Sequence, residues 1–127
     1  MNNVQPIWAD QFIKKIANSY MGLNLSRGKP IKYYSSDRIA QLMGNGLLTF
    51  NQRFPQINSL LDFDDRTIFE TPEELAKGLN YFKNNLTEAK LVAKKNYNEY
   101  HKLYSSEKVC KYFLNCLFDK DLDEFSW

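Results

Sequence analysis

The stretch that most constrains this chain runs from Tyr33 to Phe50, because it combines a helix start, a helix end and a strand. Ser35 and Ser36 are residue types that cap helices, and Asp37 places a negative charge in the first turn. Gly44-Asn45-Gly46 then supplies positions that tolerate a positive φ, which helix ends commonly need. The apolar run that follows is typical of a buried strand.

A basic loop directly precedes this stretch and holds Arg27, Lys29 and Lys32. A helix N-terminus attracts anions because its first backbone N–H groups are unpaired and carry partial positive charge. A helix start that faces a basic loop therefore predicts an anion site.

Strands that alternate with helices indicate a parallel sheet. Apolar spacing predicts a helix over 11–18 that Asp10 caps, a buried strand over 20–25 and a minimal third strand over 67–69. One or two helical turns are expected over 56–61. Such alternation forms βαβ units with right-handed crossovers. We therefore predict a single α/β domain over 1–127, with a small parallel sheet of about three strands and helices on both sides.

The C-terminal half is predicted to be helical. Thr71, Pro72 and Glu74 form the capping box of a helix that ends near Asn84-Asn85. Thr87 is expected to cap a second helix, and Ser105 or Ser106 a third. The third helix is expected to bury five side chains, namely Val109, Tyr112, Phe113, Cys116 and Leu117. The acidic segment 119–127 is expected to be a flexible tail.

Charge is unevenly distributed along the chain. Residues 1–60 hold 7 Lys/Arg and 2 Asp/Glu, whereas residues 61–127 hold 10 and 13, for a formal net charge of +2. A nucleic-acid partner usually needs a stronger basic stripe, so none is expected. No segment resembles a signal peptide, and no apolar run approaches the roughly 18 residues of a membrane span.

The other residues that could carry chemistry are interpreted as structural. Cys110 and Cys116 are six residues apart on a predicted helix, which favours reduced thiols and a cytoplasmic location over a disulfide or metal pair. His101, the only histidine, has no partner at catalytic spacing. Asp64-Asp65 is interpreted as a solvated turn, and no metal site is expected.

The predicted fold brings the basic loop and the helix start together. In a parallel α/β sheet, ligands bind beyond the carboxyl ends of the strands. The strand over 20–25 ends just before Arg27, and the next helix begins at Ser36. We therefore expect Arg27, Lys32 and the helix start through Arg38 at one edge, where an α/β domain would hold a phosphate.

Order and motifs together resemble a known family. The segment Asn24–Phe50, supported by the helix that opens with Thr-Pro-Glu-Glu-Leu, resembles the end of the donor-binding domain of GT-B glycosyltransferases. It is most similar to the group-1 type that includes spore-maturation glycosyltransferase-like proteins, and the resemblance covers roughly Phe12 to Leu117. The resemblance implies a partial Rossmann-like domain that binds a nucleotide-sugar donor as substrate, with no other cofactor.

The same resemblance implies roles for individual residues. Arg38 falls on the family's motif Arg, and with Arg27 and Lys32 it would neutralise the donor diphosphate. The backbone N–H groups of residues 35–37 match the turn that meets the phosphates. Gln41 falls where the family commonly has a Glu on the nucleotide ribose, and Tyr33 falls where many members have a second Glu.

The length of the chain leaves its role open. A GT-B enzyme has two Rossmann-like domains with the substrates between them, and this chain corresponds to about the last half of the second. A fragment or subunit of a transferase would therefore need an N-terminal acceptor domain or a partner subunit. A non-catalytic module that completes its sheet with a partner is the alternative. A response-regulator-like domain would need carboxylates at the strand ends, where this chain has basic residues.

Overall fold

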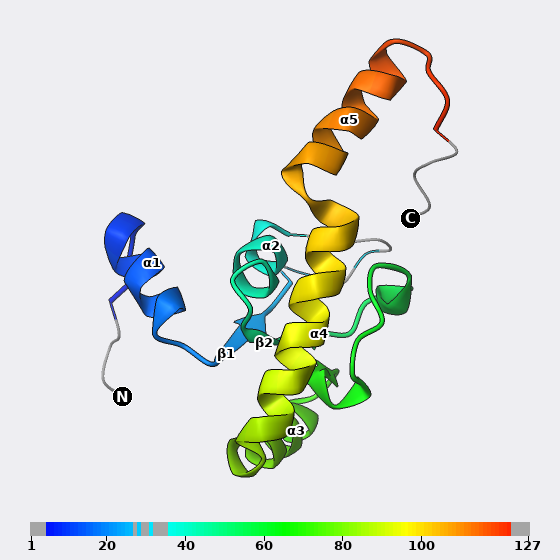
Figure 1. The fold of residues 1–127 in the computed structure, drawn as a ribbon. Coiled ribbons are helices and arrows are strands. Elements are labelled where there is room, and N and C mark those ends of the chain that lie inside the picture. Colours follow the sequence, from blue (N-terminus) through cyan, green and yellow to red (C-terminus); the bar gives the residue numbers. More distant parts are fainter. Residues whose placement is uncertain (1–4, 27, 29–30, 32–35, 123–127) are drawn as a thin grey trace.

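The computed structural model describes residues 5–26, 28, 31 and 36–122, and it shows an α/β fold with a helical C-terminus (Figure 1). In chain order the helices and strands are α1 (Ala9–Ala17), β1 (Met21–Asn24), α2 (Asp37–Met43), β2 (Leu48–Gln52), β3 (Ile68–Phe69), α3 (Pro72–Asn84), α4 (Leu86–Tyr104) and α5 (Ser106–Leu117). Two short 3-10 turns, η1 (Ile57–Ser59) and η2 (Asp65–Thr67), connect β2 to β3. The predicted small parallel sheet with flanking helices is confirmed.

The sheet has the order β1-β2-β3, and both strand pairs are parallel. Asn24 at the end of β1 pairs in register with Asn51 of β2, which in turn pairs with Ile68 of β3. Since all three strands run the same way, their carboxyl ends lie at one edge of the sheet.

The two faces of the sheet pack against different helices. On one face, Gly22 of β1 lies so close to Leu42 of α2 that an added Cβ would be 2.6 Å from its Cδ2 atom. On the other face, the ring of Phe50 in β2 meets the ring of Phe82 in α3 edge to face, with centroids 6.1 Å apart. Helices therefore cover both faces, as the alternating pattern predicts.

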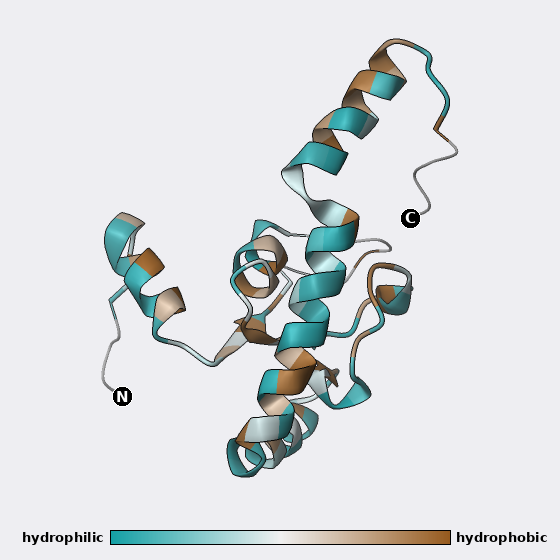
Figure 2. Cartoon of the chain, viewed as in Figure 1, coloured by the Kyte–Doolittle hydropathy of each residue, from teal (hydrophilic) through white to brown (hydrophobic). Residues whose placement is uncertain are grey.

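Helix α4 contacts the segments that precede β2 and β3. Tyr97 of α4 lies near Gly46, just before β2, and Glu88 pairs with Arg66, just before β3. Ala89 and Ala93 join the apolar cluster of Leu48, Phe50 and Phe82, whereas Tyr100 and Tyr104 pack against the cluster around Ile39, Met43 and Phe63. Helix α4 thus contacts both parts of the core and lies near the amino ends of the strands. Coloured by hydropathy, α4 alternates apolar and polar patches along its length (Figure 2).

The helix that follows the basic loop ends as predicted. Gly46 has φ 76°, its N–H donates to the Met43 carbonyl, and the N–H of Leu47 donates to the Leu42 carbonyl. The capping box of α3 is also confirmed, because Thr71 Oγ1 accepts from the Glu74 N–H and the Glu74 side chain accepts from the Thr71 N–H. Ser105 caps α5 through its hydroxyl, which accepts from the N–H of Lys108.

Three predicted element starts are wrong by one or two residues. Helix α1 begins at Ala9 after Trp8, so Asp10 lies in its first turn and does not cap it. The N-cap position of α4 is Asn85 and not Thr87, because Asn85 alone separates α3 from α4, and the Asn85 side chain makes no capping bond to α4. Thr67 belongs to η2, where its hydroxyl donates to the Asp64 carbonyl, and β3 starts after it.

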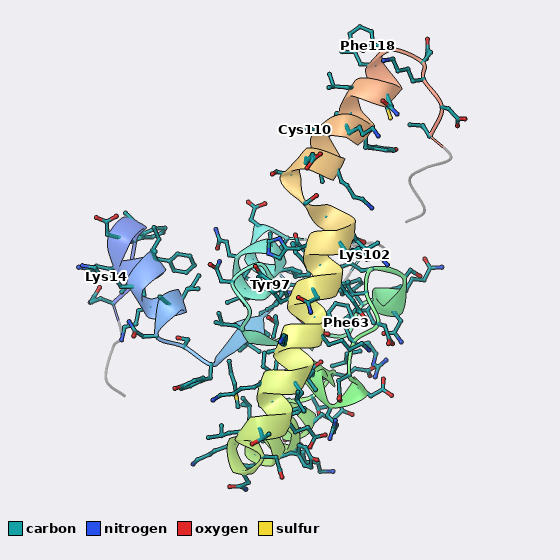
Figure 3. The ribbon with its side chains drawn as sticks, in the orientation of Figure 1. Lys14, Phe63, Tyr97, Lys102, Cys110 and Phe118 are labelled. Carbon is teal, nitrogen blue, oxygen red and sulfur yellow. The ribbon has the colours of Figure 1, made fainter. Side chains whose placement is uncertain are left out.

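The predicted burial of α5 is wrong. No residue of α5 is buried, and Phe113 and Leu117 are 66% and 73% exposed. Side chains crowd around the lower part of α4, whereas Cys110 on α5 and Phe118 just after it lie away from the sheet (Figure 3). Among the described residues, no helix is long and apolar enough to cross a membrane.

Candidate functional site at the carboxyl edge of the sheet

A chain of buried and partly buried polar side chains joins the carboxyl ends of β1 and β2 to the start of α2. Ser36 Oγ donates to Asn24 Oδ1 over 3.1 Å, and Asn24 Nδ2 donates to Asn51 Oδ1 over 3.1 Å. Asn51 Nδ2 donates in turn to the Thr49 carbonyl over 3.2 Å. Because Asn24 and Asn51 are fully buried, these bonds form away from water, where leaving them unmade is costly. They hold the first turn of α2 against the sheet.

The segment that leaves β1 is tied to both neighbouring elements. The Ser26 N–H donates to Gln52 Oε1 over 3.2 Å, and Arg38 Nη1 donates to the Leu25 carbonyl over 2.5 Å. Arg38 is half-buried by this contact. The backbone beyond β1 is therefore fixed by one residue of β2 and one residue of α2.

A pocket lies further along the carboxyl edge of the sheet, toward β3. Arg53 Nε lies 2.7 Å from Glu70 Oε1, and the Arg53 N–H donates to the Phe69 carbonyl over 2.8 Å. Glu74 accepts from the Glu70 N–H, and this bond lowers the pKa of the Glu74 carboxyl. A hollow of about 570 Å³ lies between Glu70 and the segment 53–58.

The structure places four of the seven predicted site residues: Ser36 is the N-cap of α2, and the other three, Asp37, Arg38 and Gln41, lie on this helix. Ser36 is the N-cap, but its hydroxyl bonds Asn24 and makes no cap bond, while its carbonyl accepts from the Ile39 N–H. Asp37 is exposed in the first turn, as predicted, and Gln41 is exposed one turn later. Arg27, Lys32 and Ser35 lie outside the described residues, so the meeting of the basic loop with the helix start stays a prediction.

Sequence reasoning missed Asn24, Asn51 and Gln52, which tie this edge together. All three are polar residues in the last two positions of short, otherwise mostly apolar strands. Asn is depleted in strands, so an Asn at the end of a predicted parallel strand carries a signal. That signal could have marked the edge before the structure was known.

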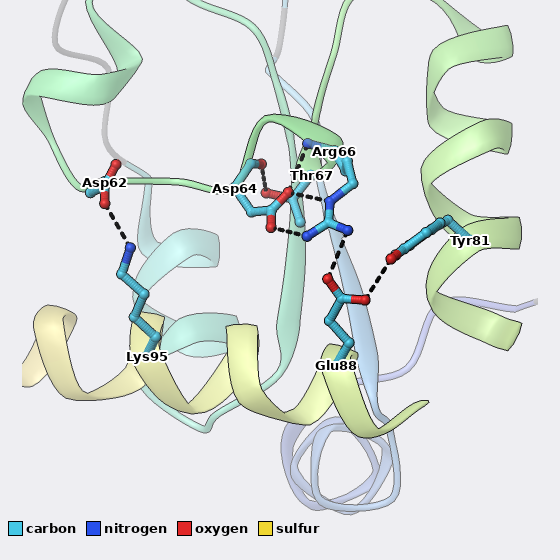
Figure 4. A network of polar contacts seen from close by, with 7 residues as sticks. All are labelled: Asp62, Asp64, Arg66, Thr67, Tyr81, Glu88 and Lys95. Atoms are coloured by element: carbon cyan, nitrogen blue, oxygen red, sulfur yellow. Dashed lines mark hydrogen bonds and ion pairs between the residues drawn. The ribbon is translucent and has the colours of Figure 1, made fainter. Parts of the chain in front are cut away.

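Another polar network lies near the amino end of β3 and is structural (Figure 4). Asp64 accepts from Arg66 through Nε at 2.8 Å and Nη2 at 2.5 Å, and Arg66 Nη1 reaches Glu88 at 2.8 Å. The Arg66 side chain holds the pKa of the Asp64 carboxyl below its usual value. The hydroxyl of Tyr81 donates to Glu88, and that bond lowers the pKa of Glu88. This network clamps η2 between α3 and α4.

Asp64 and His101 both have structural partners. Asp64 caps η2 by accepting from the Arg66 N–H, and in the described part of the chain no three His, Cys, Asp or Glu side chains gather as a metal site would need. His101 Nε2 lies 3.1 Å from the Gly44 carbonyl, and its ring centroid lies 4.3 Å from that of Tyr97. His101 therefore links α4 to the end of α2, in line with the structural role expected for it.

An apolar hollow of about 350 Å³ lies at the opposite side, near the amino ends of β1 and β2. It runs between α4 and the segments before these strands, with Tyr20, Gly46, Ala93 and Tyr97 among its lining. Ligands of parallel α/β sheets bind beyond the carboxyl ends, so we assign the candidate site to the edge with Asn24 and Ser36.

Comparison with known proteins decides the family. A family model described as glycosyl transferase-like matches residues 1–115, which include every strand and all of α1 to α4. The chain belongs to this glycosyl transferase-like family. No curated protein and no solved structure matches. The resemblance to group-1-type glycosyltransferases is confirmed, and in this family member the polar edge around Asn24 and Ser36 is the candidate site.

Proposed function

We propose that this chain binds the nucleotide-sugar donor of a glycosyl transfer reaction, at the carboxyl edge of its parallel sheet. The observation that carries the proposal is the family match over residues 1–115, which includes the strands and α2. The hydrogen-bonded chain from Ser36 through Asn24 to Asn51 supports it, because it holds the start of α2 at the edge where such sheets take ligands.

In this proposal, basic residues neutralise the diphosphate of the donor. Arg38, together with Arg27 and Lys32, supplies positive charge, and the backbone N–H groups of residues 35–37 donate to phosphate oxygens. An Arg side chain has five N–H donors, and the contact with the Leu25 carbonyl uses one at Nη1. The leaving diphosphate gains negative charge in the transition state, so donors fixed at this position favour the reaction.

Gln41 contacts the nucleotide ribose in this proposal. It is exposed on α2, one helical turn after Asp37. A Gln side chain both donates and accepts hydrogen bonds, so it suits a hydroxyl group without adding charge. The acceptor substrate is bound by a second domain or a partner subunit, as in a GT-B arrangement. The reaction takes place in the cytoplasm.

Thermal shift with nucleotides tests the donor site. The chain is melted with UDP, GDP, TDP and their sugars, and one nucleotide is expected to raise the melting temperature. Binding at 100 times Kd stabilises a protein by about 2.7 kcal/mol, which is several degrees for a domain of this size. Arg38→Ala is expected to abolish the shift, and Arg38→Lys to keep part of it.

The control variant is Lys83→Ala, which removes an exposed cation from the last turn of α3. It is expected to leave the nucleotide shift unchanged. If no nucleotide shifts the melting temperature and Arg38→Ala has no effect on binding, the donor-site proposal fails. A non-catalytic interaction module is then the better reading of this family member.

A further inference from the structure

The pocket at the carboxyl ends of β2 and β3 holds four polar residues. Arg53 follows β2 directly and Glu70 follows β3 directly, and both are in the lining of the pocket. Gln56 and Asn58, which are both exposed, are in the lining as well. The volume of about 570 Å³ lies within the roughly 300–1,000 Å³ of small-molecule sites. The pocket therefore has the size and the polar groups of a site for a small ligand.

Arg53 and Glu70 form an ion pair whose backbone is held in place. Arg53 Nε lies 2.7 Å from Glu70 Oε1. The Arg53 N–H donates to the Phe69 carbonyl over 2.8 Å, and the Glu70 N–H donates to Glu74 Oε2 over 2.7 Å. The two side chains of the pair are 47% and 60% exposed. A ligand in the pocket can therefore reach charged groups that start from fixed backbone positions.

The pair offers hydrogen-bond donors and acceptors without net charge. An Arg side chain has five N–H donors and a carboxylate has about four acceptor sites, whereas the contact at 2.7 Å joins one nitrogen to one oxygen. Hydrogen bonds that involve an ionised group are roughly twice as strong as those between neutral groups. Since the other residues of the lining carry no charge, the pocket suits a neutral ligand with several hydroxyl groups better than a second phosphate.

The pocket lies on the same edge of the sheet as the proposed diphosphate position. Strand β1 pairs with β2 and β2 with β3, and a spacing of about 4.8 Å between neighbouring strands separates the ends of β1 and β3 by roughly 10 Å. Ser36 is bonded to the last residue of β1, and Glu70 follows β3. In a nucleotide sugar the diphosphate joins the nucleoside to the sugar. With the ribose at Gln41 on α2, the sugar is the part of the donor that is left for the pocket.

We propose that Arg53 and Glu70 bind hydroxyl groups of the donor's sugar and determine which sugar the chain accepts. This role rests on the proposed donor site and adds the part of the substrate that lies beyond the diphosphate. The Glu70 carboxylate accepts hydrogen bonds from sugar hydroxyls, and the Arg53 guanidinium donates to their oxygens. A site that binds a hydroxyl in this way rejects a ligand that lacks it, because the polar groups of the site are then left unpaired.

Isothermal titration calorimetry with matched ligands tests this role. The ligands are UDP, GDP and TDP, each alone and as its glucose, galactose and mannose form. Arg53→Ala and Glu70→Gln are each expected to raise the Kd of the bound nucleotide sugar at least about ten-fold, since hydrogen bonds to charged groups are lost. Both variants are expected to change the Kd of the nucleoside diphosphate alone by less than about two-fold.

The matched control is Glu73→Gln, which neutralises an exposed carboxylate in the first turn of α3, outside the pocket. It is expected to leave both Kd values unchanged. Arg38→Ala is expected to weaken the diphosphate and the nucleotide sugar alike, because it acts on the part that the two ligands share. Far-UV circular dichroism checks that each variant stays folded.

Failure of the donor site and failure of this role give different results. If no nucleoside diphosphate binds, the donor site fails, and the role of Arg53 and Glu70 fails with it. If a diphosphate binds but none of its sugar forms does, the donor site stands and the role of the pair is overturned. The same conclusion follows if both pocket variants leave the Kd of the nucleotide sugar unchanged, or raise the two Kd values equally.

Discussion

At the scale of single residues, Gly78 shows how closely α3 approaches the rest of the protein. A Cβ atom at this position would lie 2.4 Å from the Arg66 carbonyl oxygen and 2.9 Å from Cε1 of Phe50. Gly within a helix normally costs stability, because it gains nothing from side-chain contacts and loses more backbone freedom on folding. Here the missing side chain allows α3 to contact η2 and β2 directly.

Gly78→Ala is therefore expected to destabilise the protein. Replacing Gly by Ala in an exposed helix would stabilise by up to about 1 kcal/mol, but overpacking at a tight contact costs about 1–3 kcal/mol. Urea unfolding measures the difference in free energy of unfolding. Asn80→Ala, two residues further on the same helix and exposed, is the control and is expected to change it by less than about 0.5 kcal/mol. A more stable Gly78→Ala variant would contradict the close packing.

Ser36 shows what sequence reasoning can and cannot give for one side chain. The pattern correctly places Ser36 at the N-cap, because the following apolar spacing defines where the helix begins. Its hydroxyl bonds Asn24, twelve residues earlier, and not the helix backbone. Local spacing does not encode that partner, since β1 and α2 meet only after the sheet has formed.

At the scale of elements, short-range signals and the alternation of strands with helices predicted the structure well, whereas the burial of one helix was not predicted correctly. The capping box of α3 and the Gly46 turn after α2 were confirmed, because both depend on residues within a few positions. The burial of α5 was predicted wrongly from spacing alone. An amphipathic pattern shows that a helix has an apolar side, but not whether this chain supplies anything to cover it.

The network that joins η2, α3 and α4 is expected to make stability depend on pH. The pKa values of Asp64 and Glu88 are lowered in the folded protein, chiefly by hydrogen bonds from Arg66 and Tyr81 respectively. A carboxyl whose folded pKa lies below its unfolded pKa stabilises the fold above the unfolded value and loses this contribution as pH falls. Stability is therefore expected to fall as pH drops below about 4–5, where unfolded carboxyls bind protons.

Asp64→Asn is expected to remove part of this pH dependence. It deletes one carboxylate of the network, and a partly exposed ion pair contributes up to about 1 kcal/mol at neutral pH. Urea unfolding at pH 7 and at pH 3 is expected to show a loss at pH 7 that disappears at pH 3. Asp65→Asn changes the exposed neighbour in the same turn and is the control. Equal losses at both pH values would show that charge is not the cause.

At the scale of the whole molecule, the central part of the chain carries the hydrophobic core, and the first and last helices contribute no buried residue. All buried residues of the described chain lie between Asn24 and Asn96, from the end of β1 to the middle of α4. Helices α1 and α5 have no buried residue. The candidate donor site around Asn24 and Ser36 therefore lies in the part of the chain that carries the core, and not on α1 or α5.

A chain that ends after Ser105 is expected to keep the fold of the sheet and helices α2 to α4, which hold the buried residues. Since α5 buries nothing, its removal is expected to lower the melting temperature by only a few degrees, the shift that about 1 kcal/mol produces. Phe82→Ala is the contrasting variant, because Phe82 is fully buried and its truncation costs about 3–5 kcal/mol. A loss of cooperative unfolding on shortening would show that α5 supports this part of the chain through contacts beyond those of its exposed side chains.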